Sequence, residues 1–158
     1  MNFMLNPDTD LTISRVIKAP RARVWSAWSD PRSFEQWWVP EPAKCKVVEM
    51  ELRAGGGFMT QISENDGPFG PHLSGCFLDV VEGERIVFTN ALLGGWRPAA
   101  QPFMTAIITL ADHPEGTEYL AQVMHKDNAD RNMHAEMGFY DGWGTVIEQL
   151  ARRVEAGA

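Results

Sequence analysis

The sequence predicts an α+β fold, in which a curved antiparallel sheet of six or seven strands packs against one long C-terminal helix. Three observations support it. Short apolar runs separated by Gly- and Pro-rich turns fill residues 45–125, as in hairpin-connected strands. Two short helical segments precede them. Residues 131–156 carry apolar side chains along one side of a helix, the only element large enough to cover one sheet face.

The first elements are a strand, a helix and a second short helix. Apolar and polar residues alternate over 11–18, which predicts a strand. A helix is expected over 21–28, after a proline suited to its start. Asp30 and Pro31 fit an N-cap and the first helical position, so a second helix should follow and end near Trp37.

Six more strands complete the expected sheet. They are predicted over 45–52, 58–64, 72–82, 85–91, 103–111 and 118–125. Two long Gly- and Pro-containing loops, 65–71 and 93–102, separate some of them. In the final helix, Gly142 and Gly144 flank Trp143 at a cost of about 1 kcal/mol each relative to Ala. Close helix–sheet packing or room for a ligand would offset that cost, and Trp143 itself is expected to be buried.

The bulk composition indicates one ordinary globular domain over 10–156, after a flexible N-terminus at 1–9. Of the 158 residues, 44% are hydrophobic and 22% are charged. The net charge of −7 and the lack of a Lys/Arg cluster argue against a nucleic-acid partner. We find no apolar run long enough to span a membrane and no signal-peptide pattern, so we expect a cytoplasmic protein. Cys45 and Cys76 are expected to be reduced core residues.

Neither a metal site nor a cofactor is expected. The two cysteines are isolated, and His134 and Glu136 are two residues apart on a helix, so they do not share a face. His125 or His134 could act as a general base facing a cavity. We favour a structural role at an element end or on a solvated helix face, since no orienting carboxylate and nucleophile lie nearby in sequence.

Asp79 lies in an otherwise apolar strand. Strict alternation places it on the same face as Phe77 and Val81, which favours an inward side chain. There it could form a buried pair with Arg15 or bind the polar end of a ligand. A structural salt link is favoured over catalysis.

Several segments, in this order along the chain, resemble the START-like or helix-grip proteins (also called SRPBCC or Bet v-like). Within them the chain is similar to the bacterial AHSA-type branch, which resembles the C-terminal domain of the heat-shock-protein ATPase activator. The resemblance implies the helix-grip fold, a pocket between sheet and helix, and a possible chaperone partner. The matching segments are 15–20, Val24-Trp25, Asp30-Pro31, Trp37-Trp38 with Pro40, 75–81, 84–89 and 138–143.

The leading functional hypothesis is a small-molecule-binding protein with an apolar pocket for a hydrophobic or aromatic ligand. The loop-borne Trp96 is either a mobile flap at the pocket entrance or an aromatic docked on its own domain. Alternatives are a cyclase- or hydratase-type enzyme using His125, Asp79 or Tyr140 as acid or base, and a chaperone-related interaction module. The candidate ligand-binding residues are Trp38, Phe58, Phe77, Asp79, Phe88, Trp96, Met104, Ile108, Met124, His125, Met137 and Tyr140.

Overall fold

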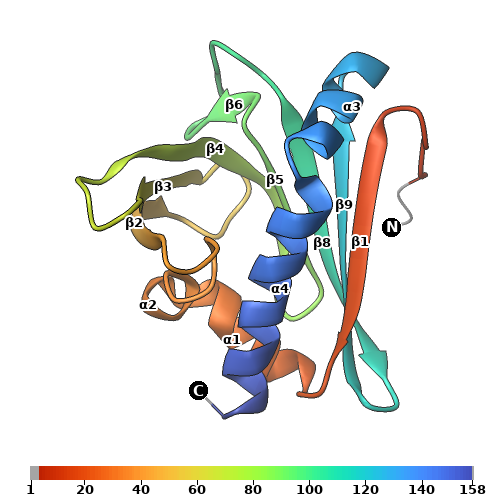
Figure 1. The fold of residues 1–158 in the computed structure, drawn as a ribbon. Coiled ribbons are helices and arrows are strands. Elements are labelled where there is room, and N and C mark those ends of the chain that lie inside the picture. The colour runs from red at the N-terminus through yellow and green to blue at the C-terminus, as the bar shows by residue number, and fades with distance from the viewer. Residues whose placement is uncertain (1–3, 158) are drawn as a thin grey trace.

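The computed structural model describes residues 4–157 of the chain, and Figure 1 shows its arrangement. The helices and strands follow one another as β1 (Asp10–Ile17), α1 (Arg21–Ser29), α2 (Pro31–Phe34), β2 (Lys44–Met50), β3 (Gly57–Ser63), β4 (Gly70–Val81), β5 (Arg85–Thr89), β6 (Leu92–Leu93), β7 (Arg97–Pro98), β8 (Met104–His113), β9 (Gly116–His125), α3 (Asn128–Glu136) and α4 (Phe139–Glu155).

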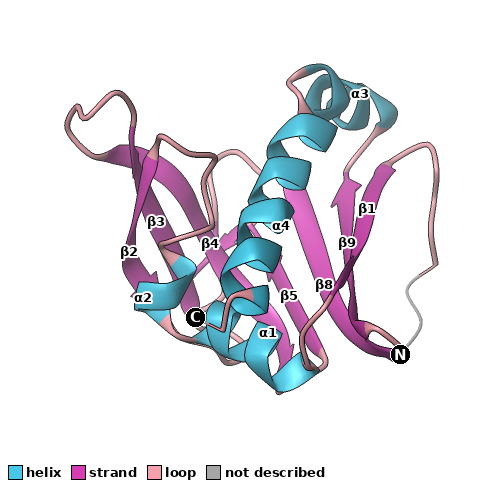
Figure 2. Ribbon diagram, turned by 60° about the horizontal axis from the view of Figure 1, so that its bottom comes forward, coloured by secondary structure: helices cyan, strands magenta, loops and turns pink. Residues whose placement is uncertain are grey.

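Seven strands form one antiparallel sheet in the order β1-β9-β8-β5-β4-β3-β2. The sheet curves around α4, which crosses its inner face, while α1 and α2 close one end (Figures 1 and 2). This is the predicted α+β helix-grip architecture. A small two-stranded hairpin, made of β6 and β7, overlaps the predicted 93–102 loop and begins one residue before it. Within residues 4–157, no helix is long and apolar enough to cross a membrane.

The C-terminal helix is broken, and the prediction of one helix over 131–156 was wrong in this respect. α3 begins after the N-cap Asp127, whose side chain accepts a hydrogen bond from the Asp130 amide at 2.8 Å. Gly138 then has φ 96°, a left-handed conformation that glycine adopts at little cost. α3 ends at Glu136, and α4 starts at Phe139, directly after Gly138. α3 is therefore a separate short helix beside the end of β9.

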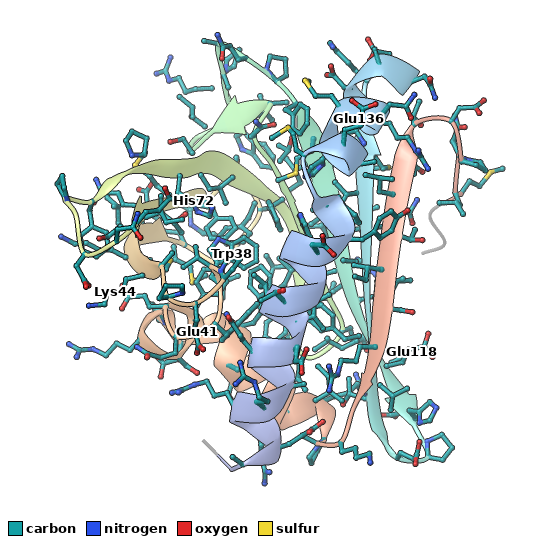
Figure 3. All side chains as sticks on the ribbon, viewed as in Figure 1. Trp38, Glu41, Lys44, His72, Glu118 and Glu136 are labelled. Atoms are coloured by element: carbon teal, nitrogen blue, oxygen red, sulfur yellow. The ribbon has the colours of Figure 1, made fainter. Side chains whose placement is uncertain are left out.

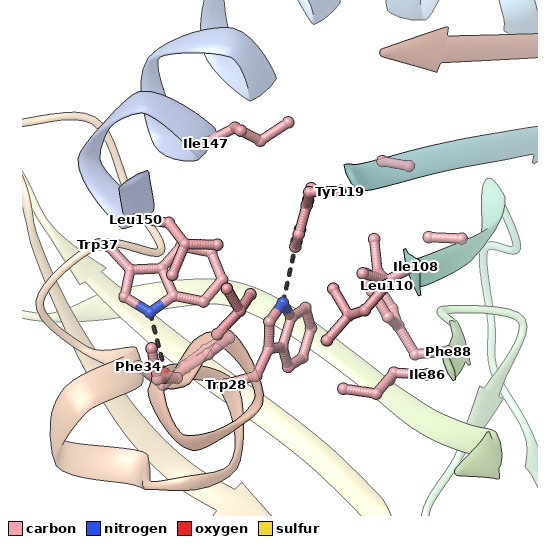
Figure 4. Packing of buried hydrophobic residues seen from close by; sticks show 14 of the residues in the cluster. Trp28, Phe34, Trp37, Ile86, Phe88, Ile108, Leu110, Tyr119, Ile147 and Leu150 are labelled. Atoms are coloured by element: carbon pink, nitrogen blue, oxygen red, sulfur yellow. Dashed lines mark hydrogen bonds between the residues drawn. The ribbon is translucent and has the colours of Figure 1, made fainter. Parts of the chain in front are cut away.

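A dense aromatic core fills the space between α1, α2, the second half of α4 and the sheet (Figure 4). Phe58 and Phe77 stack at 4.5 Å between ring centroids, and Trp28 is completely buried. The Trp28 indole donates to the hydroxyl of Tyr119 at 2.9 Å. Such buried rings dominate the energy of a core when their polar atoms are paired, as here.

Asp79 points away from this core, contrary to the inward orientation favoured by alternation. A β-bulge lies between Phe77 and Asp79, so that Phe77 pairs with Phe88 but Asp79 pairs with Val87. The extra residue reverses the alternation from this point onward. Asp79 is consequently on the outer face, where its carboxylate accepts from Arg85 Nε at 2.7 Å. The expected structural salt link exists, but with Arg85 in place of Arg15.

The segment before β1 is tied to the sheet. The Asp10 amide donates to the Asn6 carbonyl at 2.8 Å, and the Thr9 carbonyl accepts from His125 on β9. A flexible terminus was expected over 1–9, of which residues 1–3 lie outside the described part. These bonds place Thr9 beside the end of β9, which is important for the site below.

Candidate functional site

A groove of about 390 Å³ lies beside the first half of α4, between that helix, α3, β4 and the start of β8. Its volume falls in the usual range for small-molecule sites. The side chain of Met137, 71% exposed, stands at its rim. Most of the wall is apolar and three side chains are polar. The lining comprises Trp38, Pro40, Leu73, Phe103, Met104, Met137, Gly142, Trp143 and Val146, with His72, Asn90 and His134 as the polar members.

Trp38 is held in the wall by a contact between α4 and the segment that follows α2. Gln149 of α4 is buried, and its Nε2 donates to the carbonyls of Trp37 at 3.1 Å and Val39 at 2.8 Å. Its Oε1 accepts from the Glu41 amide at 2.8 Å. One glutamine thus satisfies the backbone on both sides of Trp38, and fixes where that indole lies relative to α4 (Figure 3).

The indole N–H of Trp38 is buried and has no hydrogen-bond partner in the described part of the chain. Two neighbouring tryptophans differ from it. Trp28 donates to Tyr119, and Trp37 donates to the Ala27 carbonyl at 3.0 Å. A buried donor without a partner costs about 1–3 kcal/mol. A ligand acceptor at Trp38 Nε1 would recover that energy.

Asn90 fixes the opposite wall. Its Oδ1 accepts from the backbone amides of Phe103 at 2.8 Å and Met104 at 2.9 Å. These bonds secure the strand start that carries both apolar side chains into the groove. Because the carbonyl oxygen is used in this way, the Nδ2 group of Asn90 is the part that remains to donate to a ligand.

Two histidines meet where α3 covers the end of β9. His125 Nδ1 lies 2.8 Å from the Thr9 carbonyl oxygen, and His125 Nε2 lies 2.8 Å from His134 Nδ1. The His134 ring packs edge-on against Phe139, with Phe103 and Trp143 also close. Burial, with a smaller effect of His125, lowers the pKa of His134 to about 4. His134 is therefore neutral near pH 7.

His72 lies on β4, at the other side of the groove from α3. Its Nδ1 is 2.9 Å from Thr60 Oγ1. Burial lowers its pKa, so this ring also favours the neutral form. The polar part of the groove therefore offers neutral donors and acceptors and no fixed charge among its lining residues.

Three of the candidate ligand-binding residues line the groove: Trp38, Met104 and Met137. Met124 and His125 line a smaller neighbouring hollow of about 260 Å³, which shares Phe103 and Met104 with the groove. The remaining candidates lie elsewhere, and a ligand contact for them stays a prediction. Phe58, Phe77, Phe88 and Ile108 are core residues, Asp79 is on the outer face, and Tyr140 is half exposed.

Trp96 is docked on its own domain. A Cβ atom placed at Gly55 would lie 2.7 Å from the Trp96 ring, and the Gly95 amide donates to the Gly55 carbonyl at 2.8 Å. Trp96 does not line the groove. Of the two interpretations left open by the sequence, the structure favours the docked aromatic.

The groove also contains residues that were not among the candidate ligand-binding residues, including Phe103, Asn90, His72 and Trp143. Trp143 was expected to be buried; it is half-buried, since it lines the groove wall. The sequence signal that could have placed Trp143 in the groove is its position between Gly142 and Gly144. Asn90 and His72 gave no signal, because only the folded sheet brings them to α4.

The described residues contain no group of three or more His, Cys, Asp or Glu side chains placed to hold a metal ion. His125 and His134 bond to one another and lack a third ligand in that part of the chain. Metal independence remains a prediction. The free Cys45 is buried, and burial together with Glu35 raises its pKa to about 12, so it is a poor nucleophile.

Comparison with known structures supports the architecture. A protein from Nitrosomonas europaea is 37% identical, with a TM-score of 0.88 over 97% of this chain and 98% of its own. A protein from Chromobacterium violaceum is 28% identical, with a TM-score of 0.71 over 90% and 95%. The AHSA1-like protein from Aeromonas hydrophila is 21% identical and shares the fold, with a TM-score of 0.70 over 94% and 93%.

No curated protein matches the chain significantly. The family model for the Activator of Hsp90 ATPase homolog 1-like proteins matches residues 18–155, which include every wall of the groove. This family supports a ligand-binding or a chaperone-related domain. The chain belongs to the Activator of Hsp90 ATPase homolog 1-like family.

Proposed function

We propose that this protein binds a small apolar or aromatic molecule in the groove beside the first half of α4, and that it does so in the cytoplasm. The observation that carries the proposal is the unpaired, buried N–H of Trp38 in the wall of a 390 Å³ apolar groove. A folded protein rarely retains such a donor unless water or a ligand completes it. The aromatic and Met side chains around it suit a flat apolar body.

Gly142 allows a direct test. A Cβ at this position meets nothing within 4 Å, and the residue lines the groove. Gly142→Leu should therefore fill the groove without disturbing the core. Thr145→Leu is a matched control, because it adds the same side chain to an exposed position on the same helix.

The measurement is titration calorimetry and thermal shift with 1-methoxynaphthalene as the probe. We expect the wild type and Thr145→Leu to bind and to gain melting temperature. Gly142→Leu should lose both effects. Equal binding by Gly142→Leu would place the ligand elsewhere, and a wild type that binds neither this probe nor a molecule retained from its host would refute the proposal.

A protein-interaction module is the second candidate. Met133, Met137 and Tyr140 expose 45%, 71% and 51% of their surface where α3 meets α4. Exposed apolar groups of this kind are found at docking surfaces. Under this alternative, substituting Met133 and Tyr140, which do not line the groove, with Ser would abolish binding to a chaperone partner. The same double variant should leave binding of the naphthalene probe unchanged, and this difference discriminates between the two candidates.

A further inference from the structure

With both rings neutral, the geometry of the Thr9–His125–His134 chain determines its hydrogen positions. A carbonyl oxygen can only accept, so His125 Nδ1, 2.8 Å from the Thr9 oxygen, carries a hydrogen. In a neutral His125 the other nitrogen, Nε2, then has a free lone pair. His134 Nδ1, 2.8 Å away, must donate to that lone pair.

This leaves a lone pair on Nε2 of the neutral His134. Within residues 4–157, His134 forms its hydrogen bond through Nδ1, and the residue lines the groove. Successive hydrogen bonds polarise one another, so the Thr9 carbonyl strengthens His134 Nε2 as an acceptor through His125. The groove thus contains an oriented acceptor, and its wall contains the buried N–H donor of Trp38.

The surrounding rings indicate what shape of molecule would reach both atoms. The ring centroid of Trp143 lies 6.4 Å from those of Trp38 and His134 alike. Phe103 packs against His134 at 5.0 Å between centroids. A planar ring resting on Trp143 would have Trp38 and His134 among its neighbours, and aromatic faces favour such contacts.

We propose that the groove selects phenol-class ligands, meaning aromatic molecules whose neutral hydroxyl donates a hydrogen bond to His134 Nε2. This inference rests on the proposed function and specifies its ligand. Asn90 Nδ2 is available for an acceptor elsewhere on the same molecule. A carboxylate is a worse match at His134, because it cannot donate and the ring carries no positive charge to attract it.

His134 recognises the hydroxyl without removing its proton. The pKa of His134, about 4, lies far below that of a phenol, which is near 10 as in tyrosine. Proton transfer from the phenol to the ring would therefore be strongly unfavourable. The pair is a hydrogen-bonding device for binding, with His125 as the positioning residue that sets the tautomer of His134.

The test compares 1-naphthol with 1-methoxynaphthalene at pH 8, where ordinary histidines and 1-naphthol are both neutral. The methyl ether has the same ring and more apolar surface, but its oxygen cannot donate. We expect the wild type to bind 1-naphthol about tenfold more tightly, the equivalent of one hydrogen bond. His134→Phe should bind both equally, while His113→Phe, on the distant β8–β9 hairpin, should keep the preference.

Nitrogen-15 NMR of labelled histidines in the wild type gives a second readout that does not depend on a variant folding. His134 Nε2 should show the signature of an unprotonated nitrogen, and that signal should shift with 1-naphthol but not with its methyl ether. Equal affinity for the two probes, or a protonated Nε2 at pH 8, would overturn this inference and leave the proposed groove intact. Binding of neither probe, together with no molecule retained from the host, would instead refute the proposed function.

Discussion

The two halves of α4 cover two different interiors. The second half, with Ile147, Leu150 and Val154 fully buried, closes an aromatic core in which Trp28 and Trp37 both have hydrogen-bond partners. The first half covers a groove whose wall contains the unpaired Trp38. Two adjacent tryptophans thus differ within residues 4–157: Trp37 has a hydrogen-bond partner in the core, whereas Trp38 has an unpaired N–H in the groove wall.

Helix composition explains the difference. The second half of α4 carries branched apolar side chains toward the sheet, whereas the first half places Gly142 where such a side chain would stand. The aromatic side chains therefore interlock in one region and surround a space in the other. Unsatisfied polar atoms and missing volume at the same place distinguish a binding site from a core.

The largest expected effect concerns the closed region. A chain ending at Asp130 lacks α4 and exposes the inner face of the sheet. It should lose near-ultraviolet circular dichroism and bind an apolar dye, as loosely packed states do. Retention of native dichroism by this shortened chain would show that α4 is not needed to close the core.

A matched pair of substitutions compares the regions directly. Trp28→Phe leaves the buried Tyr119 hydroxyl without its donor and leaves a void, so it should cost about 2–4 kcal/mol. Trp38→Phe removes a donor that has no partner, and should change the free energy of unfolding by less than about 1 kcal/mol. Urea denaturation measures both. Equal losses would mean that the groove wall is packed like the core.

The pH dependence of stability should contain a contribution from His134. Its pKa of about 4 in the folded state is below the ordinary value of 6.5, so the unfolded chain binds more protons between these values. Stability should therefore fall as the pH decreases from 6.5 to 4, by on the order of 1–2 kcal/mol from this partly exposed group after solvent screening.

His134→Phe should reduce that loss when denaturation is measured at pH 7 and pH 4.5. Part of the slope should remain, since the pKa of His72 is also lowered by burial and acts in the same direction. An unchanged slope in the variant would show that burial beside His125 does not lower the pKa of His134.

The smallest effect is expected in the open region. Gly142→Ala adds a methyl group that meets nothing within 4 Å and raises helix propensity. It should stabilise the protein by about 0.5–1 kcal/mol in thermal or urea unfolding. At Gly144 a Cβ would meet Ile13 at 3.5 Å, an ordinary van der Waals contact, so the same substitution there should stabilise the protein at least as much. A loss at Gly142 would mean that α4 lies closer to its surroundings there.

The sequence by itself determined the strands of the main sheet, the two short helices after the first strand and the family resemblance. Alternation, the cap at Asp30 and the apolar stripe of α4 are local properties, because each depends on residues within a few positions. It also indicated that Trp38, Met104 and Met137 belong with a pocket. It did not separate these from Phe58, Phe77 and Phe88, because an apolar ring in a core and one in a groove have the same pattern.

Only the tertiary structure decided the remaining features. The bulge after Phe77 turned Asp79 outward, and the left-handed Gly138 divided the C-terminal helix. Contacts across more than 100 positions, from Gln149 to Trp37 and from Thr9 to His125, placed Trp38 and His134 in one groove. Register, helix direction and tautomer depend on partners distant in the chain, and for this reason local patterns could not specify them.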